Sequence, residues 1–270
     1  MRSLLLTFFF LPALALTAQD SSATYNYKGR LFLYWGYNRS AFTNSDIHFE
    51  GPGYDLTMQD VTAADRPHRF STDTYLNPKY VWYPQYNYRL GWYFREDWSI
   101  SMGLDHMKYV VDAGQEVNWE GELGVLTDER PATLVLDSAV LQYEHTDGLN
   151  LVSVDVDRYW KLWRSANART DLRLYTGAHA GPVIARSDVR LFSEGMNNRF
   201  NLAGYGLGVQ TGLHFTFLQH FFVRNTLRAG YIHMPNVLTT GNADEQASQH
   251  FGFLQHAIVA GGCFRIGGKK

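Results

Sequence analysis

The feature that most restricts this fold is an alternation of side chains in residues 204–217, GYGLGVQTGLHFTF. From Tyr205 to Phe217 every second residue is apolar or aromatic, except Thr211, and the residues between them are glycine or polar. Successive side chains point to opposite faces in an extended strand, so this segment predicts a strand with one apolar face. Lipid or a protein core must cover that face, which leaves a membrane β-barrel or a β-sandwich.

Seven further segments resemble this one, and we expect strands at 29–42, 85–94, 98–107, 150–163, 171–181, 221–231 and 256–266. Residues 134–146 are ambiguous. They form one long strand, 134–163, if the chain bulges at Thr146-Asp147-Gly148, and the total is then eight. They pair with a further strand near 115–126 if there are ten. We expect eight strands, with ten as the alternative.

The first eighteen residues have the pattern of a secretory signal peptide. Arg2 precedes an apolar run that ends at Leu16, and small residues near its end suit a cleavage site. The run is too short and too early to be a spanning helix, and the sequence shows no such helix after it. We therefore expect residues 1–18 to be a signal peptide and residues 19–270 to form a single domain.

Export, alternating strands and no spanning helix together predict an all-β fold, a closed antiparallel transmembrane β-barrel in a bacterial outer membrane. Closure satisfies every backbone hydrogen bond without a sheet edge. Aromatic residues make up 15% of the chain, which is typical of interfacial girdles; a secreted β-sandwich with an aromatic core is the alternative. Short connections at 95–97, 165–170 and 218–220 suit the periplasm. Long extracellular loops are expected at 43–84, 110–149, 186–199 and 235–250.

Charge and cysteine content narrow the possible partners. A net charge of −2 gives no electrostatic reason to expect nucleic acid. Cys263 is the single cysteine, so no intramolecular disulfide can form. We expect no cofactor. The expected partners are outer-membrane lipid and lipopolysaccharide, together with the barrel-assembly machinery during biogenesis.

The polar faces of the predicted strands carry charges of both signs. An eight-stranded barrel is just wide enough for its own side chains to fill it, so we expect a solid interior in which buried charges pair. A narrow channel is the weaker alternative. The expected polar network of the lumen comprises Arg89, Asp155, Asp157, Arg173, Arg224, Arg228 and Arg265, with Arg30, Asp105, His179 and His214 also facing inward.

Histidine and acidic residues gather in segments that we place near the extracellular ends of strands. Imidazole and carboxylate groups suit zinc or a similar ion, although the metal stays unknown. The same groups would suit a hydrolase or acyltransferase acting on outer-leaflet lipid, with His106 or His145 as base. Neither HExxH nor GxSxG occurs, and no residue is assigned a catalytic role. The candidate binding cluster comprises Asp46, His48, Asp105, His106, Glu144, His145, Asp147, Asn150 and His233.

Five segments together resemble a Bacteroidota group of outer-membrane β-barrel proteins to which no activity is attached: YWGYNRSAFTNSDIHFEGPGYDLTMQDV, DHMKYV, EHTDGLN, AGYGLGVQTG and GYIHMPN. This resemblance implies a small barrel in the outer membrane and transfers no catalytic residue. The architecture is also similar to eight-stranded lipid A deacylases and palmitoyltransferases. The deacylases' His-x-Ser arrangement on a strand does not occur here, which counts against an enzyme.

The sequence therefore predicts an outer-membrane barrel with a filled interior that acts in surface structure or in binding through its extracellular loops. The alternative is an enzyme that modifies outer-leaflet lipid, as a deacylase or acyltransferase does. A narrow channel is a third and weaker interpretation.

Overall fold

The computed structural model describes residues 25–81, 83–124, 131–195, 199–240, 242 and 244–265. The predicted signal peptide, residues 1–18, lies outside these residues. Within the described part, no helix has the length and apolar character needed to cross a membrane.

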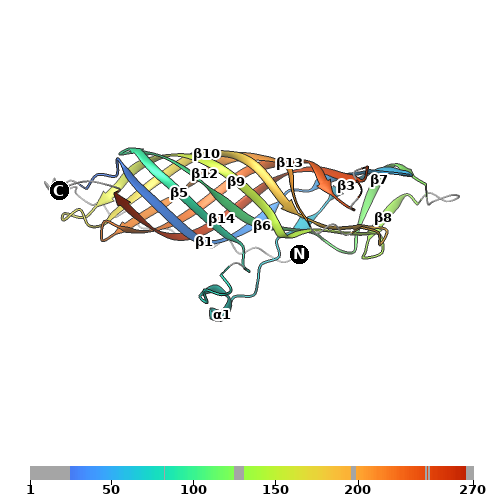
Figure 1. Ribbon diagram of the computed structural model, residues 1–270, viewed down its shortest axis with the longest axis horizontal. Coiled ribbons are helices and arrows are strands. Elements are labelled where there is room, and N and C mark those ends of the chain that lie inside the picture. Colours follow the sequence, from blue (N-terminus) through green and yellow to red (C-terminus); the bar gives the residue numbers. More distant parts are fainter. Residues whose placement is uncertain are drawn as a thin grey trace.

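Eight long strands form the body of the structure, and we call them the barrel: β1 (Arg30–Phe42), β5 (Tyr86–Arg95), β6 (Trp98–Val111), β9 (Leu141–Arg164), β10 (Asp171–Arg186), β12 (Phe200–Phe217), β13 (Phe221–Leu238) and β14 (Gln246–Arg265). Neighbours pair antiparallel in this order, and β14 also pairs with β1 from Arg30↔Arg265 to Phe42↔Phe253. Figure 1 shows these strands tilted around a common axis. Each segment predicted as a strand overlaps one of them.

The ambiguous segment 134–146 divides between two strands, and the structure combines a part of each alternative drawn from the sequence. Its first part lies in β8 (Thr133–Leu136), which pairs with β7 (Gln115–Leu123) through Gln115↔Leu136. Its last part begins β9. The register between β6 and β9 shifts between Met107↔Leu149 and Tyr109↔His145, so β9 carries its extra residues at 146–148, where the sequence predicted a bulge.

Segments predicted as long extracellular loops are largely strands with a core of their own. β2 (Ser45–Gly51) pairs with β14 and continues the sheet through β3 (Tyr54–Val61) to β7 and β8. β11 (Asp188–Leu191) pairs with β9, and β4 (Ala63–Ala64) pairs with β6. We call β2, β3, β7, β8, β11 and the adjoining ends of β9, β13 and β14 the extension; it lies at the right in Figure 1, away from the short turns.

The extension is stable as β-structure because its inward residues are apolar. Ile47 and Phe49 of β2 and Leu56 and Met58 of β3 are fully buried in one cluster with Leu136 of β8. These apolar pairs alternate on either side of a Gly51-Pro52-Gly53 turn, which is a hairpin signature. Their burial explains why the chain continues as strands in segments that the sequence predicts to be loops.

One part of the first long connection leaves the barrel sideways. We call residues 65–85 the arm, of which residue 82 is not described. The arm contains one short helix, α1 (Thr72–Tyr75), whose N-terminus is capped by the Ser71 side chain. In Figure 1 it stands off the flank of the barrel near the start of the extension.

Outward and inward faces of the barrel strands follow the predicted alternation. Met102 and Val209 point outward and expose 60% and 61% of their surface, whereas Ser101 and Gln210 beside them are buried. We call the outward apolar residues the apolar belt; it includes Leu90, Trp92, Met102, Val154, Leu207, Val209, Leu227 and Ile258. A surface of this kind needs an apolar solvent, because soluble monomers rarely expose so large a contiguous apolar surface.

Aromatic side chains fill the interior near the short turns. The segment before β1 folds into this end, where Tyr27 is fully buried and donates a hydrogen bond to Asp171 at 2.7 Å. Above it, Phe32 and Tyr93 pack with ring centroids 5.0 Å apart. The N-terminal segment therefore closes one end of the interior with side chains of the chain itself.

Candidate functional site

A network of buried ion pairs crosses the barrel interior. Arg89 of β5 is fully buried, with its Nη2 atom 2.5 Å from Asp105 Oδ2 and its Nε atom 3.1 Å from Asp155 Oδ2. Arg228 of β13 reaches the same two oxygens at 3.0 and 3.3 Å. The two guanidinium groups and two carboxylates neutralise one another where an unpaired charge would be very costly.

Arg224 forms a second charged centre nearer to the short turns. Its Nη1 atom lies 3.8 Å from Asp157 Oδ2, its Nε donates to His214 Nδ1 at 2.8 Å, and its Nη2 donates to the Tyr159 hydroxyl at 2.7 Å. The guanidinium carbon lies 4.8 Å from the centre of the Phe32 ring. The cation is therefore held by aromatic rings as well as by a carboxylate.

Two further predicted lumen residues, Arg173 and Arg265, lie at or near the rim. Arg173 Nη2 lies 2.7 Å from Glu96 Oε1, and its Nε lies 3.2 Å from Asp171 Oδ2. Arg265 is exposed and lies outside the network. Arg265 is paired with Arg30 at the end of the β1–β14 ladder. At this position the strands extend past the filled interior, so an inward-facing side chain has no interior to enter.

The structure does not bring the four loop histidines together. His48 lies on the outer face of β2, 3.8 Å from Asp55. His145 is fully buried in the extension, with Nδ1 2.8 Å from Ser187 Oγ. His233 lies on the outer face of β13, and His106 lies on the outer face of β6.

The acidic members of the predicted cluster are also separated. Asp105 belongs to the interior network, Asp46 accepts a hydrogen bond from the Asp60 N–H, and Glu144 pairs with Arg66 at 2.6 Å. Among the described residues, no group of three or more His, Cys, Asp or Glu side chains is placed to hold a metal ion.

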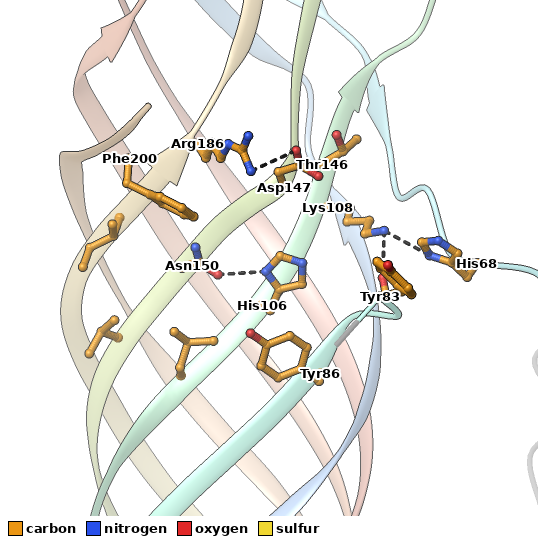
Figure 2. Close-up of a pocket in the computed structure, with 13 residues that line it drawn as sticks. His68, Tyr83, Tyr86, His106, Lys108, Thr146, Asp147, Asn150, Arg186 and Phe200 are labelled. Carbon is orange, nitrogen blue, oxygen red and sulfur yellow. Dashed lines mark hydrogen bonds and ion pairs between the residues drawn. The ribbon is translucent and has the colours of Figure 1, made fainter. Parts of the chain in front are cut away.

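Three members of the cluster do meet, in a cavity of about 560 Å³ on the outer wall of the barrel. His106, Asp147 and Asn150 line it together with residues of the arm, and we call this cavity the lateral cleft (Figure 2). Its complete lining is His68, Tyr83, Tyr86, Leu104, His106, Lys108, Thr146, Asp147, Asn150, Val152, Ile184, Arg186 and Phe200.

Hydrogen bonds hold the polar groups of the lateral cleft in place. His106 Nδ1 lies 2.8 Å from Asn150 Oδ1, so this nitrogen carries the proton and donates. The Lys108 ammonium donates to His68 Nδ1 and to the Tyr83 carbonyl, both at 3.1 Å. Figure 2 shows both sets of contacts.

Charges of both signs border the cleft. Arg186 Nη1 lies 3.4 Å from Asp147 Oδ2, whereas Lys108 forms no ion pair with any described carboxylate. Burial, and after it the nearby Lys108 ammonium, lower the pKa of His68 below its ordinary value of 6.5. His68 is therefore neutral at pH 7, and its Nδ1 atom accepts a hydrogen bond from the Lys108 ammonium, which keeps its proton and its positive charge.

Polarity changes along the cleft in the direction of the barrel axis. Leu104 and Val152 line the end of the cleft that is nearer to the short turns. Each lies two residues from a belt residue on the outer face of the same strand, Met102 in β6 and Val154 in β9. Lys108 and Thr146 lie further along β6 and β9, toward the extension. The cleft therefore has an apolar floor toward the short turns and a polar upper half toward the extension. It suits a molecule with one apolar end and one charged end.

Lys108, Arg186 and the arm residues of this cleft are not among the site residues predicted from the sequence. Lys108 could have been found, because it stands two residues after His106 on the same face of a strand. His68 and Tyr83 belong to a segment without strand or helix periodicity, so nothing in the pattern places them beside β6.

No family model matches the chain, and no curated protein matches it; the resemblance to a Bacteroidota group stays a prediction. The fold is similar to solved outer-membrane structures. Outer membrane protein OprG from Pseudomonas aeruginosa is 9% identical over 89% of this chain and 98% of its own, with a TM-score of 0.43. Outer membrane protein AlkL is 9% identical over 95% and 100%, with a TM-score of 0.40. Ail, the attachment invasion locus protein of Yersinia pestis, is 12% identical over 88% and 99%, with a TM-score of 0.36.

Proposed function

We propose that this protein is a closed, eight-stranded transmembrane β-barrel of the bacterial outer membrane that conducts nothing and acts by binding at its extracellular side. One observation carries the proposal. The Arg89, Arg228, Asp105 and Asp155 side chains occupy the interior and form ion pairs with one another. Because the interior is filled, we expect the functional surface to lie on the outer wall of the barrel and on the extension.

The placement of polar and apolar surface supports a membrane orientation. The apolar belt surrounds the barrel between the short turns and the extension. The extension has its own apolar core and does not need lipid to cover it. We therefore place the turns at 96–97, 165–170 and 218–220 in the periplasm and the extension outside the cell.

Lipid modification is the second candidate, because the His106–Asn150 hydrogen bond orients an imidazole beside the membrane. A base of this kind needs a nucleophile within hydrogen-bond reach. Among the described side chains, the ring of His106 is hydrogen-bonded to Asn150 alone. We therefore propose binding as the function and keep lipid modification as the second candidate.

Cysteine labelling on intact cells tests the membrane orientation. Wild type supplies the background control, because its one cysteine, Cys263, is buried. Val135→Cys, on the exposed strand β8, should react with a membrane-impermeant maleimide on intact cells. Ala166→Cys, in the exposed turn after β9, should react only after the outer membrane is opened.

The same samples test barrel closure and location. Unboiled protein from the outer-membrane fraction should migrate differently from boiled protein on a denaturing gel, because a closed barrel resists detergent. Recovery in the soluble periplasmic fraction, or labelling of Ala166→Cys on intact cells, would contradict the proposal.

A further inference from the structure

We propose that the lateral cleft binds the headgroup of a phosphate-bearing lipid of the surrounding outer leaflet. This inference rests on the proposed membrane function and names the ligand of one site within it. Lys108 and Arg186 would receive the phosphate, and the acyl chains would run down over Leu104 and Val152 toward the apolar belt.

Unsatisfied positive charge is the first reason. An ammonium group has three N–H donors, and Lys108 uses two of them on His68 and Tyr83. The carboxylates nearest to it have partners of their own: Asp147 pairs with Arg186, and Asp65 accepts from the Ser40 N–H at 3.1 Å. The remaining donor and the charge of Lys108 therefore match an anion.

The shape of the cleft is the second reason. Its polar upper half and its floor of Leu104, Val152 and Ile184 are contiguous. A soluble anion such as inorganic phosphate would leave that floor in contact with water. A lipid satisfies both halves at once, because its phosphate meets the cations while its chains cover the apolar residues.

The arm supplies the third reason, since it forms one side of the cleft and carries exposed aromatic residues. Phe70 exposes 73% of its surface, and Tyr80 and Tyr83 are exposed as well. Aromatic side chains of this kind prefer the headgroup level of a bilayer. An arm that lies in the headgroup region brings His68 and Tyr83 to the same depth as a lipid phosphate.

The arm is fixed to the barrel wall and is therefore part of a built site. The Tyr37 hydroxyl donates to the Tyr75 carbonyl at 2.5 Å, and Arg39 Nη2 donates to the Tyr75 hydroxyl at 2.6 Å. Tyr75 itself is buried. These contacts fix the arm against β1, on one side of the cleft.

Native mass spectrometry of the folded protein in detergent micelles tests the proposal. The probes are dioleoyl phosphatidic acid, dioleoylglycerol, which has the same chains without phosphate, and inorganic phosphate. Wild type should retain one phosphatidic acid molecule and bind dioleoylglycerol about tenfold more weakly, because charge-assisted hydrogen bonds to the phosphate are lost. Millimolar inorganic phosphate should not displace the lipid.

Lys108→Met/Arg186→Gln should weaken retention of phosphatidic acid at least about tenfold. Lys161→Met, an exposed lysine at the other end of β9, is the matched control and should retain it as wild type does. Equal retention by the double variant and wild type would overturn the proposal, and so would equal binding of dioleoylglycerol or displacement by inorganic phosphate. The heat-dependent gel shift shows separately whether each variant is folded. If the double variant does not fold, the comparison of the three probes on wild type still tests whether the cleft binds a phosphate-bearing lipid.

Discussion

Arg228 of β13 and Asp105 of β6 meet across the barrel, with Nη1 3.0 Å from Oδ2. The two strands are four pairings apart in either direction around the order of strands, so this ion pair joins opposite walls. Arg89 shares Asp105 with Arg228, and both acids and both arginines of the network are buried. In the proposed function, this contact between opposite walls blocks a continuous water path at this level.

Removing one member of this network should destabilise the folded barrel strongly. Arg228→Met leaves two buried carboxylates to one guanidinium, and breaking a buried pair costs about 3–5 kcal/mol. Urea unfolding in lipid vesicles measures the loss in the free energy of unfolding. Arg265→Met, which removes an exposed arginine, should change it by less than about 0.5 kcal/mol. A similar small change for both variants would show that Arg228 is hydrated.

The same substitution should have different effects in the apolar belt and in the extension. Val209 and Val135 are both exposed strand residues, but only Val209 belongs to the belt. Val209→Arg should cost about 2–4 kcal/mol in vesicles if it lies near the bilayer midplane. Val135→Arg, which faces water, should be nearly neutral. Equal unfolding free energies for the two variants would contradict the assignment of the belt to lipid.

A disulfide across β1 and β14 tests closure of the barrel. Leu33 and Gly262 are paired residues, and antiparallel partners have Cα atoms about 4.5–5.5 Å apart, within the range of a disulfide. Leu33→Cys/Gly262→Cys in a Cys263→Ser background should cross-link on mild oxidation. Leu33→Cys/Leu254→Cys is the control and should not, because Leu254 pairs with Ala41 further along the seam. Free thiols in the first variant would mean that the seam is open.

Titration of His68 should report its contact with Lys108. Its pKa is lowered from 6.5, first by burial and then by the lysine. Its neutral form is therefore favoured in the folded state, so its contribution to stability is complete above pH 6.5 and is lost as the pH falls from 6.5 toward the folded pKa. Histidine-resolved NMR should give a midpoint below 6.5, and Lys108→Met should move it upward. An unchanged midpoint would mean that the two side chains do not meet.

Much of the barrel could be predicted because its physical cause is local. Alternation such as Tyr205 to Phe217 fixes which side chain meets lipid and which meets the interior, and it needs no knowledge of distant residues. The inward positions of Arg89, Asp155 and Arg228 follow from the same period. Their partners across the barrel do not, because these depend on strand order and stagger.

The extension and the lateral cleft were hidden for different reasons. Ile47, Phe49, Leu56 and Met58 alternate around a glycine-rich turn, but the polar residues between them mask this hairpin signal in the sequence. The cleft depends on tertiary contact between the arm and β6, which no periodicity encodes. Histidines grouped only by their place near strand ends, such as His48 and His145, end on opposite faces because neighbouring strand positions alternate in direction.

The most direct test of the central claim is electrical recording across planar bilayers that contain the purified, folded protein. A barrel whose opposite walls are joined by Arg228 and Asp105 should give no conductance above that of the protein-free bilayer, at either polarity. Stable, ion-selective single-channel steps from wild-type protein would contradict the account, because they require a continuous water path through the interior that these ion pairs fill.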